Sequence, residues 1–307
     1  MIQASIRAKN IKQSSLYIDS FFNLMKPRVM SLVLFTCMVG LIIAPNNVSY
    51  LNSVLSLIAV ALGAGAAGTL NMWYESDLDA LMTRTCLRPI PTGQVTKNQA
   101  LFFGISLSIG SISLLYYSSN LMSASLLLLT ICFYFFIYTV WLKRRTPQNI
   151  VIGGAAGALP PVIGWTIATG SLTIEPFILF LIIFLWTPSH FWALSIYKSN
   201  DYKKAKIPML PIIYGIEKTK KNIFIYSLLM LPTISAPYFI NFLSKIYFYP
   251  ALALTIYYIY LCGTLLKVKK NKEINTLARR IFLYSIFYLF IIFLLILSDH
   301  FFMRLYG

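Results

Sequence analysis

Long apolar runs, separated by short polar segments, recur from one end of the chain to the other. Most of them approach the ~20 residues with which a helix crosses roughly 30 Å of hydrocarbon. Because hydrocarbon offers no partner for an unpaired backbone amide or carbonyl, the segments that cross it must be helical. The pattern predicts about nine transmembrane helices, at residues 29–44, 51–70, 100–117, 121–142, 150–168, 174–197, 223–242, 246–266 and 281–298.

Composition agrees with this pattern. Hydrophobic residues make up 58% of the 307 residues and charged residues only 11%, whereas about a quarter of an average soluble domain is charged. We therefore expect an all-α polytopic membrane protein whose helices surround a central cavity. A basic arm at residues 1–24 precedes the single transmembrane domain that we expect at residues 25–307.

The positive charges are distributed unevenly over the predicted loops. With a cytoplasmic amino terminus, 24 of the 26 lysines and arginines fall on the cytoplasmic side, and only Lys245 and Arg304 fall on the other. Short loops rich in these residues stay in the cytoplasm, so we expect the amino terminus inside and the carboxyl terminus outside. The net charge of +17 follows from this bias and from attraction to anionic membrane lipid. It does not indicate a nucleic-acid partner.

Two further features bear on compartment. The four cysteines, Cys37, Cys86, Cys132 and Cys262, are scattered without a CxxC pair, which predicts neither a disulfide framework nor a zinc site. The arm is basic and bears hydroxyl groups, as organellar transit segments do. It is short, however, and contains Asp19. We therefore favour a bacterial inner membrane over the mitochondrial inner membrane.

The chain has only nine acidic residues, and several of them gather after the second predicted helix. Asn71, Glu75 and Asp79 follow one another at four-residue spacing, which stacks them along one helix face. Carboxylates at a membrane boundary are costly and usually serve a counter-charge or a pathway. Magnesium fits this set, because it is typically held by one or two carboxylates together with phosphate oxygens of a substrate.

Basic residues and a second polar cluster lie on the same side. Arg84 and Arg88 stand in the loop after the first cluster and could bind phosphate oxygens in forked pairs. Tyr197 and Asp201 end the sixth predicted helix at the same four-residue spacing. An alternative remains open at this point, in which the acids form an ordinary solvated network of salt bridges.

Three longer strings resemble a known family. NMWYESDLDALMTRTCLRPIPTG, at residues 71–93, is similar to the first aspartate-rich motif of the UbiA-type intramembrane prenyltransferases, which are nine-helix enzymes. LKRRTPQNIVIGGAAGALPPVIGW, at residues 142–165, and WTPSHFWALSIYKSNDYKKAKIPMLPIIYG, at residues 186–215, resemble the protohaem IX farnesyltransferases, or haem O synthases. The resemblance extends from about residue 25 to the ninth predicted helix.

The resemblance implies a reaction and a set of site residues. Farnesyl diphosphate and protohaem IX (haem b) would give haem O, with magnesium stabilising the departing diphosphate. A haem A synthase that takes the product is an implied partner. The motif assigns metal and diphosphate roles to Asn71, Glu75, Asp79 and Asp201, with Glu75, Asp79 and Asp201 as metal ligands. Candidate substrate contacts are Arg84, Arg88, Lys143, Arg144, Asn149 and Tyr197.

This sequence departs from the family pattern at one position. The family usually has aspartate where this chain has Glu75. The additional methylene moves the carboxylate by roughly 1 Å, which disturbs a strict magnesium octahedron unless the end of the helix adapts or the neighbouring Asp77 takes over. Asp201 is the only acid of the second motif, as the resemblance to the haem branch implies.

His190 lies inside the sixth predicted helix. A lone histidine in an apolar helix is more often a hydrogen-bonded core residue than a ligand. The intervals between His190, Leu194, Tyr197 and Asp201 place all four on one helix face if the helix continues that far. With haem as substrate, we expect His190 to contact it as an axial ligand or as a base near the reacting vinyl group.

Other functions fit parts of the sequence. Another UbiA-type enzyme of quinone or chlorophyll synthesis would share the first motif but not the TPSH string at residues 187–190. A transporter could use helices broken by proline, although the acids here gather at one membrane face. A haem-delivery protein without chemistry is a third alternative. The glycine-rich runs at residues 63–68 and 153–157 predict either close helix packing or a groove beside the helices.

Overall fold

The protein is represented by a computed structural model that describes residues 17–306. Within this range the chain is helical and contains no strand. Eight helical segments of the described range are long and apolar enough to cross a membrane, when Leu121–Leu142 and Asn149–Thr169 are each counted as one span. A ninth span results if Tyr17–Leu24 and Val29–Ile42, which are bent by 54°, are counted as one. The predicted all-α, polytopic fold class is confirmed. Most of the basic arm (residues 1–16) and Gly307 lie outside the described residues.

The helix bounds follow the predicted apolar runs. The helices are α2 (Pro27–Ile42), α3 (Tyr50–Tyr74), α4 (Ser76–Leu81), α5 (Lys97–Ser118), α6 (Leu121–Cys132), the π-helix η1 (Phe133–Leu142), α7 (Asn149–Ala158), α8 (Pro160–Thr169), α9 (Ile174–Tyr197), α10 (Ser199–Lys204), α11 (Leu210–Ile213), α12 (Gly215–Phe239), α13 (Lys245–Lys267) and α14 (Asn271–Tyr306). Two helices begin well before their apolar runs, α12 at Gly215 and α14 at Asn271. Their polar turns continue the helix beyond the apolar run that hydropathy detects.

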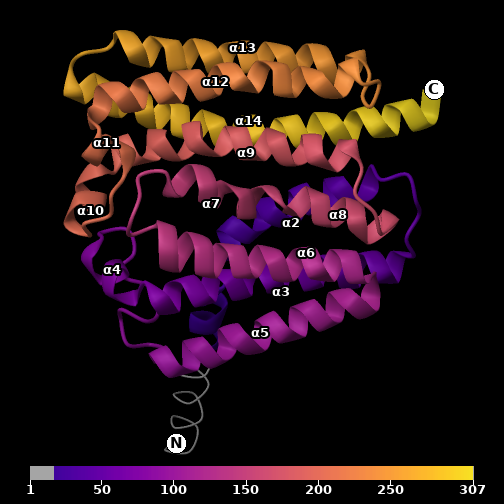
Figure 1. The fold of residues 1–307 in the computed structure, drawn as a ribbon, viewed down its shortest axis with the longest axis horizontal. Helices are drawn as coiled ribbons and strands as arrows, with labels where there is room; N and C mark the ends of the chain where they lie inside the picture. Colours follow the sequence, from indigo (N-terminus) through magenta and orange to yellow (C-terminus); the bar gives the residue numbers. More distant parts are fainter. Residues whose placement is uncertain (1–16, 307) are drawn as a thin grey trace, which may run out of the picture.

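The long helices lie side by side, and the short helices α4, α10 and α11 gather at one end of the bundle (Figure 1). One apolar core joins α9, α12, α13 and α14, and a second joins α2, α3, α6 and α8. A smaller apolar cluster at the end with α4 and α10 contains Leu78, Met82, Ile150, Tyr202 and Ile207. This cluster holds the two predicted polar motifs against each other.

Glycines permit the closest helix contacts. A Cβ atom on Gly164 would overlap the carbonyl oxygen of Cys37, so α8 and α2 meet backbone to backbone. In the glycine-rich runs, Gly63 faces the side chain of Leu127 and Gly153 faces that of Tyr138. Of the two predicted roles, close packing is the one that these two positions show.

One element has no counterpart in the prediction. The fourth span begins as the α-helix α6 and continues as the π-helix η1 over its last ten residues. The Thr139 hydroxyl donates to the carbonyl oxygen of Tyr134, and the Lys143 amide donates to that of Tyr138. The wider turn changes which side chains face α3. Such turns are frequent at functional sites.

Candidate active site

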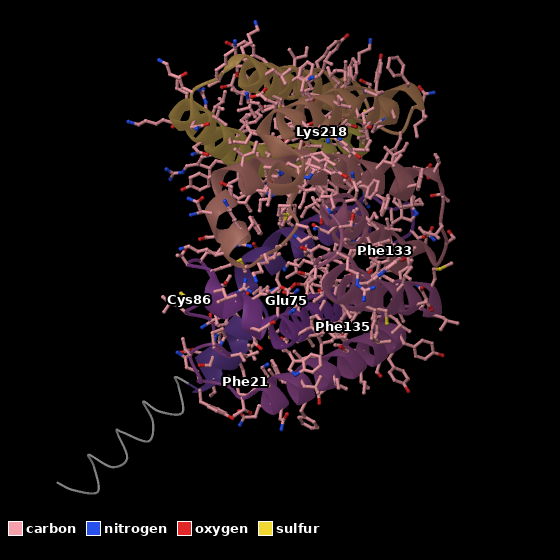
Figure 2. The ribbon with its side chains drawn as sticks, turned by 60° about the vertical axis from the view of Figure 1, so that its left-hand side comes forward. Phe21, Glu75, Cys86, Phe133, Phe135 and Lys218 are labelled. Atoms are coloured by element: carbon pink, nitrogen blue, oxygen red, sulfur yellow. The ribbon has the colours of Figure 1, made fainter. Side chains whose placement is uncertain are left out.

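The first motif keeps its helical geometry through a helix break. Although α3 ends at Tyr74 and α4 begins at Ser76, the Glu75 amide donates to the carbonyl oxygen of Asn71 at 3.0 Å. The Asp79 amide donates in turn to that of Glu75 at 2.8 Å. Asn71, Glu75 and Asp79 therefore occupy successive turns, as predicted, and all three are buried. Figure 2 shows Glu75 among the helices of the amino-terminal half of the bundle.

Each buried acid of this motif has a basic partner from another segment. Lys143, just beyond η1, lies 2.5 Å from the Glu75 carboxylate, and Arg88 lies 2.7 Å from that of Asp79. Both carboxylates are only 1% exposed. Buried charges need such partners, because an uncompensated charge in this environment is costly. The predicted alternative of a salt-bridge network is thus present, but two of its members are buried rather than solvated.

The third pair lies at the surface. Arg144 donates two hydrogen bonds, at 2.9 and 3.1 Å, to Asp77, whose side chain is 55% exposed. Burial alone would raise the pKa of Asp77, but the hydrogen bonds and the charge of Arg144 act together with backbone hydrogen bonds and lower the pKa below its ordinary value. Arg144 also lies over the ring of Tyr74. This pair borders the site without entering it.

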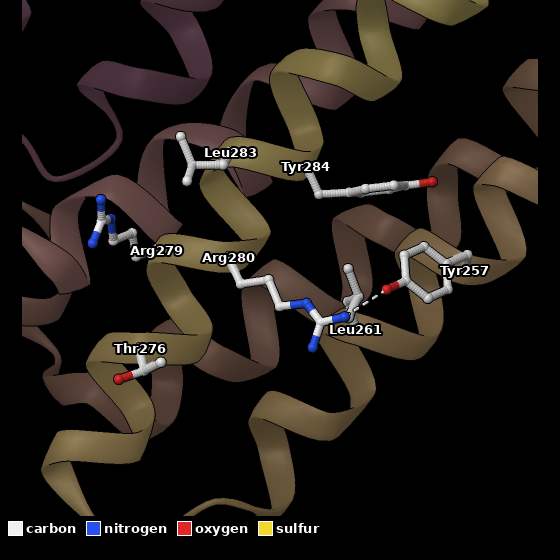
Figure 3. A pocket seen from close by; sticks show the side chains of 7 residues that line it. All are labelled: Tyr257, Leu261, Thr276, Arg279, Arg280, Leu283 and Tyr284. Carbon is white, nitrogen blue, oxygen red and sulfur yellow. Dashed lines mark hydrogen bonds between the residues drawn. The ribbon is translucent and has the colours of Figure 1, made fainter.

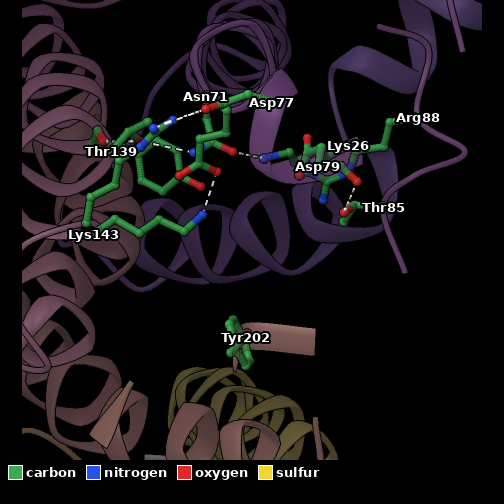
Figure 4. A network of polar contacts seen from close by, with 12 residues as sticks. Lys26, Asn71, Asp77, Asp79, Thr85, Arg88, Thr139, Lys143 and Tyr202 are labelled. Carbon is green, nitrogen blue, oxygen red and sulfur yellow. Dashed lines mark hydrogen bonds and ion pairs between the residues drawn. The ribbon is translucent and has the colours of Figure 1, made fainter. Parts of the chain in front are cut away.

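Asn71 is held from two sides (Figure 4). Lys26 donates to its side-chain oxygen at 2.5 Å, and its amide nitrogen donates to the Thr139 hydroxyl at 3.0 Å. Lys26 has a φ of +57°, which is uncommon for a residue other than glycine. Lys26 was missed as a site residue. The Lys-Pro pair at residues 26–27 is the signal, because Pro27 begins α2 and fixes the position of the lysine before it.

Asp201 is held differently. The Thr83 hydroxyl lies 2.8 and 2.9 Å from its two carboxylate oxygens, and among residues 17–306 Asp201 forms no ion pair. Arg84, the residue after Thr83, donates to the Tyr202 hydroxyl at 3.1 Å. The structure thus brings the two predicted motifs together. Thr83 was also missed, because nothing in the sequence indicates which hydroxyl of the first loop reaches the second.

The predicted helix face through His190, Leu194, Tyr197 and Asp201 is wrong. Helix α9 ends at Tyr197, and Asp201 lies on α10, which begins at Ser199. The chain turns at Lys198, whose φ of −109° and ψ of 24° are not helical. The turn takes Asp201 to the loop that follows α4. Tyr197 lies instead near Lys198 and Arg279, whose cationic groups are 4.7 and 5.8 Å from its ring centre.

His190 is fixed on three sides. Its ring stacks between Trp186 and Phe282 at centroid distances of 4.3 and 4.8 Å, and its Nδ1 lies 2.6 Å from the Ser285 hydroxyl. The side chain is 7% exposed. Its Nε2 has no hydrogen-bond partner among the described residues. His190 is therefore a hydrogen-bonded core residue, and its contact with haem stays a prediction, for which the Nε2 edge of the ring is available.

Asn149 stands at the start of α7. Its amide nitrogen donates to the carbonyl oxygen of Thr146 at 2.6 Å. Its side-chain oxygen is buried and has no hydrogen-bond partner in the described part of the chain. A buried acceptor without a donor is uncommon in a native structure and is a position where a ligand or water can bind.

The acidic side chains of the two motifs offer only a few possible ligands for magnesium. Within residues 17–306, no group of three or more acidic, cysteine or histidine side chains is placed to hold a metal ion alone. Glu75, however, has one buried carboxylate oxygen without a hydrogen bond. Magnesium typically uses only one or two carboxylates and takes its other ligands from water and phosphate. The residues therefore fit magnesium that is held jointly with a phosphate-bearing substrate.

Comparison with known proteins identifies the family. The profile of the UbiA prenyltransferase family matches residues 33–297. The protoheme IX farnesyltransferase of Pelagibacter ubique (strain HTCC1062) is 63% identical over 300 residues, covering 97% of this chain and 99% of that protein. The enzyme of the same name from Parvibaculum lavamentivorans is 50% identical over 279 residues, covering 91% and 88%.

Solved structures share the fold at low identity. A digeranylgeranylglyceryl phosphate synthase superposes with a TM-score of 0.77 at 19% identity, over 92% of this chain and 98% of that one. A UbiA homologue from Archaeoglobus fulgidus, bound to DMAPP and Mg2+, superposes with a TM-score of 0.66 at 16% identity, over 88% and 99%. With the helices, the paired motifs and the profile in agreement, this chain belongs to the UbiA prenyltransferase family.

Proposed function

We propose that this protein transfers the farnesyl group of farnesyl diphosphate to a vinyl group of protohaem IX and so forms haem O. The observation that carries the proposal is the buried set of Asn71, Glu75 and Asp79, joined through its loop to Asp201. The name shared by the full-length relatives supports the choice of the two substrates.

The first motif is suited to receive the diphosphate. Glu75, Asp79 and Asp201 are the residues that would hold magnesium. When bound, magnesium neutralises diphosphate oxygens and helps the leaving group to depart. Lys143 and Arg88 already lie against the carboxylates. Each can therefore move a short distance from its carboxylate partner to a phosphate oxygen bound beside it.

Lys26, on the other side of Asn71, can make a third contact of the same kind. Arg84 and Arg144 are further candidates. Arg84 contacts the ring and hydroxyl of Tyr202, and Arg144 lies over the ring of Tyr74 while it pairs with Asp77. Positive groups placed where negative charge develops stabilise the transition state more than the ground state. The arrangement therefore favours ionisation of the allylic ester.

The transfer exchanges a carbon–oxygen bond of farnesyl diphosphate for a carbon–carbon bond to haem. The bond between the first farnesyl carbon and its diphosphate oxygen breaks, and the diphosphate leaves with the electron pair. The terminal vinyl carbon of haem attacks the allylic cation with its π electrons, which forms the new carbon–carbon bond. Water then adds to the cation left on the other vinyl carbon and loses a proton. Haem O, diphosphate and one proton result.

His190 is our candidate for the haem side. Its Nδ1 contact with the Ser285 hydroxyl and its two stacking partners fix the ring. A ring nitrogen held in this way sets the tautomer and leaves the other nitrogen available as a ligand or base. Neutral imidazole is a common axial ligand of haem iron. We assign His190 either this role or that of a base near the vinyl group.

One assay tests the proposal. Membranes that contain the protein are incubated with haem b, farnesyl diphosphate and magnesium. The haems are then extracted and separated, and their masses are measured by mass spectrometry. We expect a product with the mass of haem O, and none when magnesium is chelated. Membranes with Asp79→Asn at the same protein level are the control. A product from a quinone precursor but none from haem b would instead support another branch of the family.

We further propose a location. The site faces the cytoplasm of a bacterial inner membrane, and a haem A synthase takes the product. In a Cys86→Ser background, an impermeant thiol reagent added to intact cells should label a cysteine replacing Asn47 but spare one replacing Lys270. The reverse pattern would invert the orientation.

A further inference from the structure

A groove of about 380 Å³ lies between α13 and α14, outside the acid network of the active site. Figure 3 shows its lining, which consists of Tyr257 and Leu261 from α13 and Thr276, Arg279, Arg280, Leu283 and Tyr284 from α14. The lining contains two arginines and no acid. The groove is therefore positively charged at one end and apolar along the remainder.

The polar end of the groove is organised. Arg280 donates a hydrogen bond of 2.9 Å to the Tyr257 hydroxyl, which occupies one of the five donors of its guanidinium group. Tyr257 packs edge-on against Tyr284 at 5.0 Å, and the Tyr284 hydroxyl donates to the carbonyl oxygen of Leu254. This wall of two tyrosines holds Arg280 in place while its other donors stay available.

The charge of this end is not neutralised. Neither arginine forms an ion pair with another described residue. Glu273, the acid of the first turn of α14, lies 3.6 Å from Lys270. An anion that enters the groove beside Tyr257 thus meets the guanidinium group of Arg280 and no competing carboxylate.

The position of the groove along the helices indicates the source of the anion. Arg280 immediately precedes the apolar run of residues 281–298, and tyrosines flank it, as they do where a helix passes from hydrocarbon to headgroups. Below it, Leu283, Phe287, Phe290 and Leu294 recur at helical spacing, and each is 38–53% exposed. The surface thus has a positive charge at the depth of the lipid phosphate groups and, next to it, an apolar stripe of three helical turns.

We propose that this groove binds an anionic phospholipid, with the phosphate on Arg280 and an acyl chain along the stripe from Leu283 to Leu294. The bilayer presents that phosphate at this depth and at high concentration. Farnesyl diphosphate also joins a charged head to an apolar chain, but its diphosphate matches the acidic motif with magnesium better than one arginine alone.

Native mass spectrometry of the purified full chain tests the proposal. Phosphatidylglycerol and phosphatidylcholine with identical acyl chains are offered to the wild type, to Arg280→Gln and to Arg145→Gln. Arg145 is exposed, lies near the active-site end of the bundle, and forms no side-chain hydrogen bond or ion pair with a described residue, so it controls for loss of one positive charge. Thermal unfolding of each variant checks that it is folded.

We expect the wild type to retain phosphatidylglycerol in preference to phosphatidylcholine. Arg280→Gln should lower this preference about fivefold, whereas Arg145→Gln should leave it unchanged. Tyr257→Phe keeps the charge but frees the guanidinium group, and should lower the preference about twofold. Equal losses in Arg280→Gln and Arg145→Gln would show general charge attraction and overturn the site.

Two competitors separate the sources of phosphate. Glycerol phosphate, the headgroup without chains, should not displace the lipid, because the apolar stripe adds no affinity for it. Farnesyl diphosphate should not displace it at concentrations that saturate the active site. Displacement by farnesyl diphosphate would assign the groove to the substrate and reject the lipid, whether or not the protein makes haem O.

Discussion

The two polar motifs of this protein lie together but hold their carboxylates in different ways. In the first, Glu75 and Asp79 are buried and each is paired with a base. In the second, Asp201 is buried yet receives only the hydroxyl of Thr83. In the first motif each buried acid thus has a basic partner, whereas Asp201 of the second motif has none among residues 17–306.

The difference indicates that the two motifs have different roles in binding a ligand. A buried ion pair adds little net stability to the folded state, because the cost of desolvating both charges offsets their attraction. Stability alone therefore does not explain these pairs. They can exchange partners at low cost when a ligand brings both a cation and an anion. Asp201, with no base to displace, is suited to receive a cation first. Replacing each group separately tests this division.

The largest effect should come from Asp201→Asn and Asp79→Asn. Each removes a charge that we assign to the metal and diphosphate site, so haem O formation should fall more than about a hundredfold, or roughly 3 kcal/mol in the transition state. Haem O is measured in membranes with matched protein levels. Glu273→Gln, at the exposed start of α14, is the control. Near-normal turnover by Asp201→Asn would remove the second motif from the site.

The next effect concerns the buried pair. Lys143→Met leaves the Glu75 carboxylate without its partner, so the folded state should lose about 3–5 kcal/mol. Thermal unfolding in detergent measures the loss. The double variant Glu75→Gln with Lys143→Met removes both charges and should recover most of it. Additive losses in the double variant would show that the two residues act independently.

A smaller effect is expected at Thr83. Thr83→Val keeps the shape of the side chain but removes the hydroxyl that donates to Asp201. A net hydrogen bond to a charged group is worth about 1.5–3 kcal/mol, and partial replacement by water should reduce the loss of turnover to about tenfold. Thr92→Val, in the same loop, is the matched control. Equal activities of the two variants would show that Thr83 does not position Asp201.

The smallest effect should come from Asp77→Asn. Exposed ion pairs contribute at most about 1 kcal/mol, so haem O formation should fall less than about fivefold. The lowered pKa of Asp77 also gives the direction of the pH dependence. The pair stabilises the fold at pH values above the pKa that Asp77 has in the unfolded state, and this contribution is lost as pH falls through its lower pKa in the folded state. Unfolding of wild type and Asp77→Asn should therefore converge at low pH. A difference that grows on acidification would contradict this.

The sequence by itself determined the class of the fold and the membership of the first motif. Apolar runs of membrane length can satisfy their backbone groups only as helices, which is why the helix positions agree with the prediction. Asn71, Glu75 and Asp79 are four residues apart, and a local helix places them on one face whatever surrounds it. The fold class thus follows from the length of the apolar runs, and the first motif follows from the spacing of its residues.

Only the tertiary structure decided which groups meet across the chain. The pairs of Glu75 with Lys143, Asn71 with Lys26 and Asp201 with Thr83 join segments far apart in sequence. The turn at Lys198 takes Asp201 away from the helix of His190, and the π-helix sets the direction of Thr139. Apolar side chains from α4, α7 and α10 pack together where the two motifs meet. Helical periodicity, which records only neighbours on the same helix, does not contain that information.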